Sequence, residues 1–165
     1  MDLERISVIA TRESIKQGVD NPGPIGNLIF AYSAALSFYK EIPHPFIHVP
    51  LLNRMLRPGS SGSFRRTPVT FQNGGSSVHP MMIEESLQRL WDTTFPWDND
   101  GDHARPVGKI GEDYIYLQGE ELNAFVKHFL YIHPFEDGNG RVGWILFNWL
   151  GGTLSSPVAL PDFKW

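Results

Sequence analysis

Residues 141–150 place the strongest constraint on the fold of this chain, because they are apolar on nearly every side. A helix that is apolar all round has to be buried. The longest apolar run within it, residues 144–150, is interrupted by Asn148 and ends at Gly151-Gly152, far short of the roughly 20 residues that a membrane span needs. We therefore expect a central helix that other helices surround, with no membrane partner.

The neighbouring segments have the pattern of helices that could cover such a core. Their apolar residues recur at three- and four-residue steps, which is typical of amphipathic helices. One of them should stop before Pro58, because the residue that precedes a proline avoids the helical region. The predicted helices are residues 3–18, residues 24–41, a short one carrying residues 51–56, one beginning near Pro80, and residues 122–132.

Residues 63–78 have a different pattern. Phe64, Val69 and Phe71 are followed by Asn73-Gly74-Gly75, a sequence suited to a positive-φ hairpin turn. This pattern predicts a β-hairpin, in which Pro68 favours an exposed edge. Residues 97–111 are predicted to form a loop and residues 114–117 a short extended segment. The fold class is therefore mostly α with one small hairpin.

Composition excludes several classes of function. The length of 165 residues fits one domain. The net charge is −4, and the sequence has no block of like charges, which argues against a nucleic-acid partner. It has no cysteine, so disulfides, thiolate metal sites and a cysteine nucleophile are excluded. Without a signal-peptide pattern we expect a cytoplasmic protein, and export by a dedicated secretion machine stays open.

Residues 133–141, His-Pro-Phe-Glu-Asp-Gly-Asn-Gly-Arg, join two predicted helices. They combine a titratable histidine, acidic residues, two glycines and an arginine. Taken singly, its residues also fit a turn and a helix cap. Together they suggest an anion site, because a glycine-rich helix start presents free N–H groups and the positive end of the dipole. Arg141 could bind the same anion, Asp137 could hold Mg²⁺, and His133 could accept a proton near pH 7. These are the parts of a phosphoryl or nucleotidyl transferase.

The nine residues resemble the signature of the Fic family, His-Pro-Phe-x-(Asp/Glu)-Gly-Asn-Gly-Arg-x-x-Arg. The resemblance extends over roughly residues 24–155, and the sequence Ser-Phe-Arg-Arg-Thr-Pro-Val from Ser63 is similar to the family's hairpin flap. It implies a Fic-type helical bundle with a small β-hairpin flap. On this interpretation residues 1–23 form an N-terminal helix and linker, and residues 24–165 form the Fic domain.

The resemblance also implies a function, that of a protein adenylyltransferase. Such an enzyme transfers AMP from ATP, with Mg²⁺, to a Ser, Thr or Tyr hydroxyl of a target protein, and it is compatible with a homo-oligomer. His133 would be the catalytic base and Asp137 the metal ligand. The implied phosphate-binding residues are Gly138, Asn139, Gly140 and Arg141, and the implied target-docking residues of the flap are Phe64, Arg65, Val69 and Phe71.

The chain departs from the family pattern at two places. The second arginine of the signature is replaced by Trp144, which removes one phosphate contact. In the family that arginine also pairs with an inhibitory glutamate of a Ser/Thr-x-x-x-Glu-Gly/Asn helix. The nearest match here has Glu13 at the Ser/Thr position and Gln17 at the glutamate position, followed by Gly18. One hypothesis is that this autoinhibition has been lost, and the other is that residues 3–18 are simply another helix.

Trp144 also leaves the nucleotide open. Two alternatives to the adenylyltransferase remain at this point. One is a Fic-like phosphotransferase that moves the terminal phosphate, and the other is a catalytically weak module that binds a nucleotide or a protein. Trp144 favours the binding module, whereas the intact His133 and Asp137 favour an enzyme.

Overall fold

The structure is a computed structural model that describes residues 3–95 and 116–163. Within these residues the chain forms six α-helices and one 3₁₀ turn. They are α1 (Leu3–Lys16), α2 (Pro22–Ser37), α3 (His48–Leu56), η1 (Pro80–Met82), α4 (Ile83–Thr94), α5 (Gly119–Ile132) and α6 (Asn139–Leu150). The predicted helices are confirmed. The predicted loop 97–111 and residues 114 and 115 lie outside the described residues, and Tyr116 and Leu117 have no regular secondary structure.

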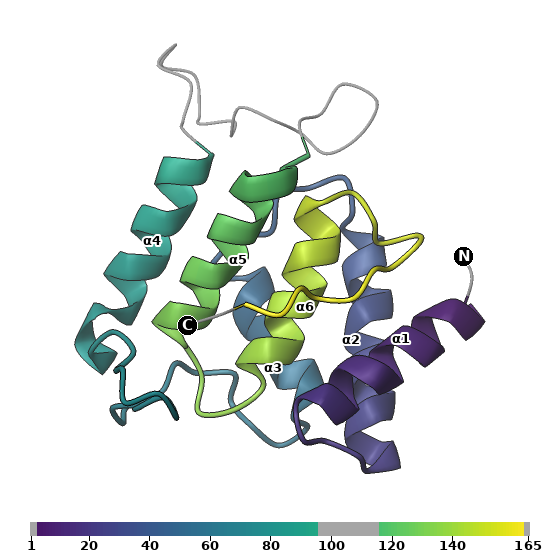
Figure 1. Cartoon of the computed structure of the whole chain (residues 1–165), viewed down its shortest axis with the longest axis horizontal. Coiled ribbons are helices and arrows are strands. Elements are labelled where there is room, and N and C mark those ends of the chain that lie inside the picture. The colour runs from purple at the N-terminus through teal and green to yellow at the C-terminus, as the bar shows by residue number, and fades with distance from the viewer. Residues whose placement is uncertain (1–2, 96–115, 164–165) are drawn as a thin grey trace.

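Helix α6 lies at the centre of the bundle, as its apolar sequence predicts. Of its residues, all but Gly140 are buried. It packs against α1, α2, α3 and α5, while α4 packs on the outer side of α5 (Figure 1). None of the helices in the described ranges is long and apolar enough to cross a bilayer.

The polar side-chain atoms of Asn148 and Trp149 in α6 are paired within this core, as burial requires. The indole of Trp149 donates to the carbonyl of Glu41 (2.8 Å). Asn148 donates to the carbonyl of Val158 (3.1 Å) and accepts from its N–H (2.8 Å), so it holds the segment after α6 against the bundle. The asparagine that interrupts the apolar run is therefore a structural residue of the core.

Helix α1 is an integral part of this bundle. Ile6 and Ala10 are fully buried, and the helix packs on α2 and α6. Its last turn also binds the C-terminal segment, because Glu13 accepts from the N–H of Leu160 (3.1 Å) and Lys16 donates to the carbonyl of the same residue (2.8 Å). The position of the end of α1 is thus fixed by contacts on two sides.

Residues 63–78, referred to here as the flap, contain no β-strand, so the predicted hairpin is wrong in this respect. The flap forms one antiparallel bridge, between Thr70 and Ser76. The predicted turn is confirmed, because Gly74 has a φ of 83°. Pro68 has no N–H to donate, and the carbonyls of Thr67 and Val78 accept from a side chain, that of Arg65, instead of from a partner strand. The ladder therefore does not extend beyond the turn.

Candidate active site at the start of helix α6

His133 ends helix α5 in an unusual backbone conformation. Its φ of 52° and ψ of 60° are left-handed, and in the described ranges it is the sole residue other than glycine with a positive φ. Its N–H donates to the carbonyl of Phe129 (3.1 Å), which closes the helix. This conformation costs a non-glycine residue about 1–2 kcal/mol and turns the chain sharply toward α6.

The imidazole of His133 is half-buried, and its surroundings favour the neutral form. Burial lowers its pKa, because the charged form loses hydration. Arg65 lowers the pKa further, whereas a hydrogen bond with the backbone of Leu130 and the charge of Asp137 act in the opposite direction. The ring of Phe71 from the flap meets the imidazole edge-on, with 5.6 Å between centroids. A neutral imidazole near pH 7 can accept a proton.

Helix α6 begins with free backbone donors. Gly138 precedes the helix with a φ of 86°, and the N–H of Val142 is the first to donate to a helical carbonyl, that of Gly138 (2.9 Å). The N–H groups of residues 139–141 therefore have no acceptor within the helix, and no side chain caps them. We refer to these three N–H groups together with the guanidinium of Arg141 as the anion cup.

The side chain of Asn139 braces the loop between α5 and α6, residues 133–138. It is buried and bridges both backbone groups of Phe135, accepting from the N–H (2.9 Å) and donating to the carbonyl (2.8 Å). From α3, Asn53 donates to the carbonyl of Asp137 (2.8 Å). The φ of 86° at Gly138 favours glycine, and a side chain there would also approach the amide nitrogen of Asn53 to 2.9 Å.

Arg141 is a buried cation with few partners. Its side chain is 4% exposed, and among the described residues its guanidinium has one acceptor, Asp137 (Nη2 to Oδ2, 3.1 Å). Arg57, which directly follows α3, has its Nε 3.5 Å from the same oxygen. Arg65, which is equally buried, donates to five acceptors. The contrast indicates that Arg141 retains donors for a ligand, whereas Arg65 is a structural residue.

Asp137 is the carboxylate that lies beside the cup, where it could hold a metal ion. Its carboxylate is exposed, Oδ1 accepts from the N–H of Gly138 (2.6 Å), and Oδ2 faces the two arginines. The described residues contain no cluster of three or more metal-ligating side chains. One carboxylate beside an anion cup still fits Mg²⁺, because this ion is typically held by one or two carboxylates and the phosphates of a substrate.

Gln17, at the end of α1, lies directly against the cup. A Cβ built on Gly140 would stand 2.5 Å from its Oε1 and 3.1 Å from its Nε2. The amide side chain therefore covers the first turn of α6 at Gly140. Sequence matching found this residue, but only the packing of α1 on α6 brings it to the cup.

Trp144, at the position of the second arginine of the signature, points into the core. It is fully buried, its ring packs on Tyr32 (4.7 Å between centroids), and its indole donates to the carbonyl of Val158 (2.8 Å). Its buried indole therefore supplies no cation to the cup. This is what the replacement of the second arginine by tryptophan predicts.

The flap residues named from the sequence divide into two groups. Arg65 is buried at the base of the flap, so it does not present its side chain to a target, whereas Phe64 packs on Phe135 (5.7 Å between centroids) and stays partly exposed. For Arg65 this differs from the expected docking role, since it is 3% exposed. Val69 and Phe71 lie on the part of the flap next to His133, and their side chains are partly exposed.

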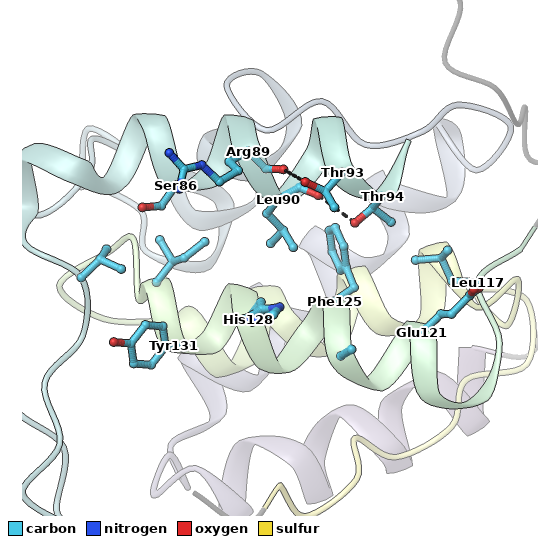
Figure 2. A pocket seen from close by; sticks show the side chains of 13 residues that line it. Ser86, Arg89, Leu90, Thr93, Thr94, Leu117, Glu121, Phe125, His128 and Tyr131 are labelled. Atoms are coloured by element: carbon cyan, nitrogen blue, oxygen red, sulfur yellow. Dashed lines mark hydrogen bonds between the residues drawn. The ribbon is translucent and has the colours of Figure 1, made fainter. Parts of the chain in front are cut away.

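A separate groove of about 530 Å³ lies between α4 and α5 (Figure 2). Its lining is mainly apolar, with Leu90 of α4 and Phe125 of α5 pointing toward each other. The groove ends at Tyr131 and Ile132 and does not include His133. It therefore borders the site without forming part of the cup.

Three residues of the site were missed by sequence reasoning. Asn53 of α3 and Arg57, which directly follows α3, reach Asp137, and no motif marks them. Glu136, the variable residue of the signature, accepts from the hydroxyl of Thr67 (2.9 Å) and so links the loop to the flap. Only the position of Glu136 inside the signature could have drawn attention to it.

The fold and the site together define a class of protein: a helical bundle with a buried central helix whose start forms an anion cup, and a half-buried histidine at the end of the preceding helix. A family model described as "Fic/DOC family" matches residues 45–151. The chain belongs to the Fic/DOC family. Members of this family are commonly transferases that modify proteins.

One similar solved structure, that of Fic-1, agrees with this fold. A fragment of Fic-1 from C. elegans is similar, with a TM-score of 0.50 and 23% sequence identity. The match covers 92% of this chain and 44% of the Fic-1 fragment, so this chain spans less than half the length of that one. BepC, a VirB-translocated effector of Bartonella tribocorum solved with bound AMPPNP, matches with a TM-score of 0.41 and 18% identity, over 84% of this chain and 72% of that one. No curated protein matches the sequence significantly.

Proposed function

We propose that this chain is a protein adenylyltransferase that transfers AMP from ATP to a hydroxyl side chain of a target protein. The observation that carries the proposal is the pairing of two features across one short loop. An imidazole whose pKa is lowered by burial stands at one end, and a cup of free N–H groups with an under-bonded guanidinium stands at the other. A base beside a phosphate site is what a nucleotidyl transfer needs.

The proposed reaction uses residues of this loop and little else. The N–H groups of residues 139–141 and the guanidinium of Arg141 bind the diphosphate of the nucleotide. His133 takes the proton of the target hydroxyl as its oxygen attacks the α-phosphorus. The bond from that phosphorus to the bridging oxygen breaks, and pyrophosphate leaves. Mg²⁺, held by Asp137 and the phosphates, would supply neutralisation of the charge on the leaving group.

Label position tests the proposal. The protein is incubated with magnesium, cell lysate and ATP that carries the label on either the α- or the γ-phosphate. Protein-bound α-label is expected. γ-Label would contradict the proposal in favour of a phosphotransferase, and the absence of both labels would contradict it in favour of a binding module, the reading that the buried Trp144 favours.

The pH dependence of transfer follows from the state of His133. Burial lowers its pKa below the usual value of about 6.5, and only the neutral imidazole can accept a proton. We expect a rate that is level from pH 7 to 8 and falls only when the pH drops through the lowered pKa. Initial rates of label incorporation between pH 5 and 8 measure this. An inflection above pH 6.5 would contradict the assignment of a buried, neutral base.

Gln17 provides a test of how α1 affects the cup. Deleting α1 would also remove buried core residues such as Ile6 and Ala10, so a point substitution is the sharper experiment. Gln17→Glu would place a carboxylate against Gly140, and two like charges about 4 Å apart near a surface repel by about 4 kcal/mol. We expect affinity for Mg-ATP, measured by calorimetry, to fall at least about tenfold.

Gln17→Ala is the matched control for this prediction. It removes the same amide without adding charge, so it should bind Mg-ATP as well as the unmodified protein or better. Equal affinity of the Gln17→Glu protein and the unmodified protein would show that the end of α1 does not reach the bound nucleotide. It would also remove the basis for the hypothesis that Gln17 marks a lost autoinhibition.

A further inference from the structure

Arg65 is the most extensively bonded side chain at the junction between the flap and the loop that carries His133. It is 3% exposed, and all three of its guanidinium nitrogens donate. Its acceptors are the carbonyls of His133 (2.6 Å), Thr67 (2.6 Å), Val78 (2.6 Å) and Ile132 (3.3 Å) and the hydroxyl of Ser77 (2.7 Å).

These acceptors belong to two parts of the chain that are distant in sequence. Ile132 and His133 supply carbonyls at the end of α5, where a helix leaves its last carbonyls without partners. Thr67 lies on one arm of the flap, and Ser77 and Val78 lie on the other. A single guanidinium therefore joins both arms of the flap to the end of α5.

The same residue also stabilises the backbone around His133. The carbonyl of His133 accepts from the Nε of Arg65, and the carbonyl of the next residue, Pro134, accepts from the backbone N–H of Arg65 (2.8 Å). These bonds hold the turn that the left-handed conformation of His133 creates. At the far end of the flap, the ring of Phe71 contacts the imidazole. His133 is thus held by the flap through both its backbone and its ring.

Other links between the flap and the loop are the packing of Phe64 on Phe135, which has no hydrogen bond to fix its direction, and a hydrogen bond of Glu136. Glu136 accepts from the hydroxyl of Thr67, but this pair is exposed to solvent. Hydrogen bonds between exposed groups contribute little, whereas removing a partner from a buried charged group costs more. Arg65 is therefore the polar contact whose loss should most affect the relative position of flap and imidazole.

We propose that Arg65 is a positioning residue that locks the flap and His133 into one unit, so that a target segment lying along the flap is held in fixed register with the imidazole. Its meaning for catalysis rests on the function proposed above, but the coupling itself is a property of the free protein. It can therefore be tested without a target and without transfer.

The experiment compares Arg65→Gln and Arg65→Lys with the matched control Arg66→Gln, an exposed neighbour that undergoes the same change of charge. Two measurements on the free protein are made by NMR. The first is amide hydrogen exchange of Phe71 and Ser77, whose N–H groups bond across the flap to Gly75 and Val69. The second is the titration of the His133 imidazole.

Both substitutions of Arg65 should speed exchange of the two flap amides at least tenfold, while amides in the middle of α6 stay protected. The pKa of His133 should rise in Arg65→Gln, because a nearby cation and part of the burial are lost, and should rise less in Arg65→Lys, which keeps the charge. Arg66→Gln should change neither measurement.

The inference is overturned if flap exchange and the His133 titration in Arg65→Gln equal those of the unmodified protein. Should Arg65→Gln fail to fold, as loss of protection in α6 would reveal, Arg65→Lys decides by the same exchange measurement: fast flap exchange supports the coupling and unchanged exchange contradicts it. If the unmodified protein transfers no label at all, the proposed function fails, whereas these measurements still decide the role of Arg65.

Discussion

Replacing His133 with alanine is expected to lower transfer of α-label by about 10²- to 10⁴-fold, the usual contribution of a positioned base. Affinity for Mg-ATP should change little, because the anion cup is made by residues 139–141 and none of its N–H groups bonds to the imidazole. The measurement is initial-rate labelling in lysate together with calorimetry on the same protein. Loss of rate without loss of binding would separate proton transfer from nucleotide binding.

His133→Asn is the control that isolates chemistry from backbone strain. Asparagine tolerates the left-handed conformation that His133 adopts better than alanine does, yet it cannot act as a base near pH 7. Both variants should therefore be equally slow, and the asparagine variant should be the more stable of the two. Labelling of either variant at the unmodified rate would remove His133 from the mechanism.

Trp144→Arg, which restores the family's second arginine, is expected to unfold much of the protein and not to create a phosphate contact. The indole is fully buried, packs on Tyr32 and donates to the carbonyl of Val158. Losing a large buried aromatic side chain costs about 3–5 kcal/mol, and an unpaired charge in its place costs more. A whole domain is stable by only about 5–15 kcal/mol, so urea and thermal unfolding should reveal a severe loss.

Trp144→Phe is the matched variant for this prediction. It keeps most of the ring against Tyr32 but removes the N–H that donates to Val158, so a smaller loss of stability is expected, and Mg-ATP affinity should be unchanged. A well-folded Trp144→Arg protein with increased Mg-ATP affinity would contradict this account. It would mean that position 144 can turn toward the cup.

The helices could be predicted from the sequence because their cause is local. Apolar residues at helical spacing mark α2, α3, α4 and α5, and the prolines and glycines between them mark their ends. The flap was predicted less well. Its apolar alternation and its Asn-Gly turn suggested strands, but the carbonyls at its base bond to Arg65, a partner that no local pattern reveals.

The candidate site, like the fold, could be predicted from the sequence only in part. His133, Asp137 and the glycines follow one another along the chain, so their joint chemistry could be inferred from order alone. The supporting contacts of Asn53 and Arg57 come from α3 and the residue that follows it, which are distant in sequence, and the side chain of Arg65, expected at a docking surface, is buried. Such contacts depend on how helices pack, which spacing along one segment does not specify.

By itself, the sequence determined that this protein is a helical bundle around one apolar helix and that a histidine, a carboxylate and a glycine-rich helix start share the turn before that helix. The tertiary structure alone decided that Gln17 covers the first turn of α6, that Trp144 faces the core, and that Arg65 connects the flap to His133. The physical reason is the range of the interactions. Helix periodicity and turn chemistry act over a few residues, whereas burial and hydrogen bonding join residues that only the packed bundle brings together.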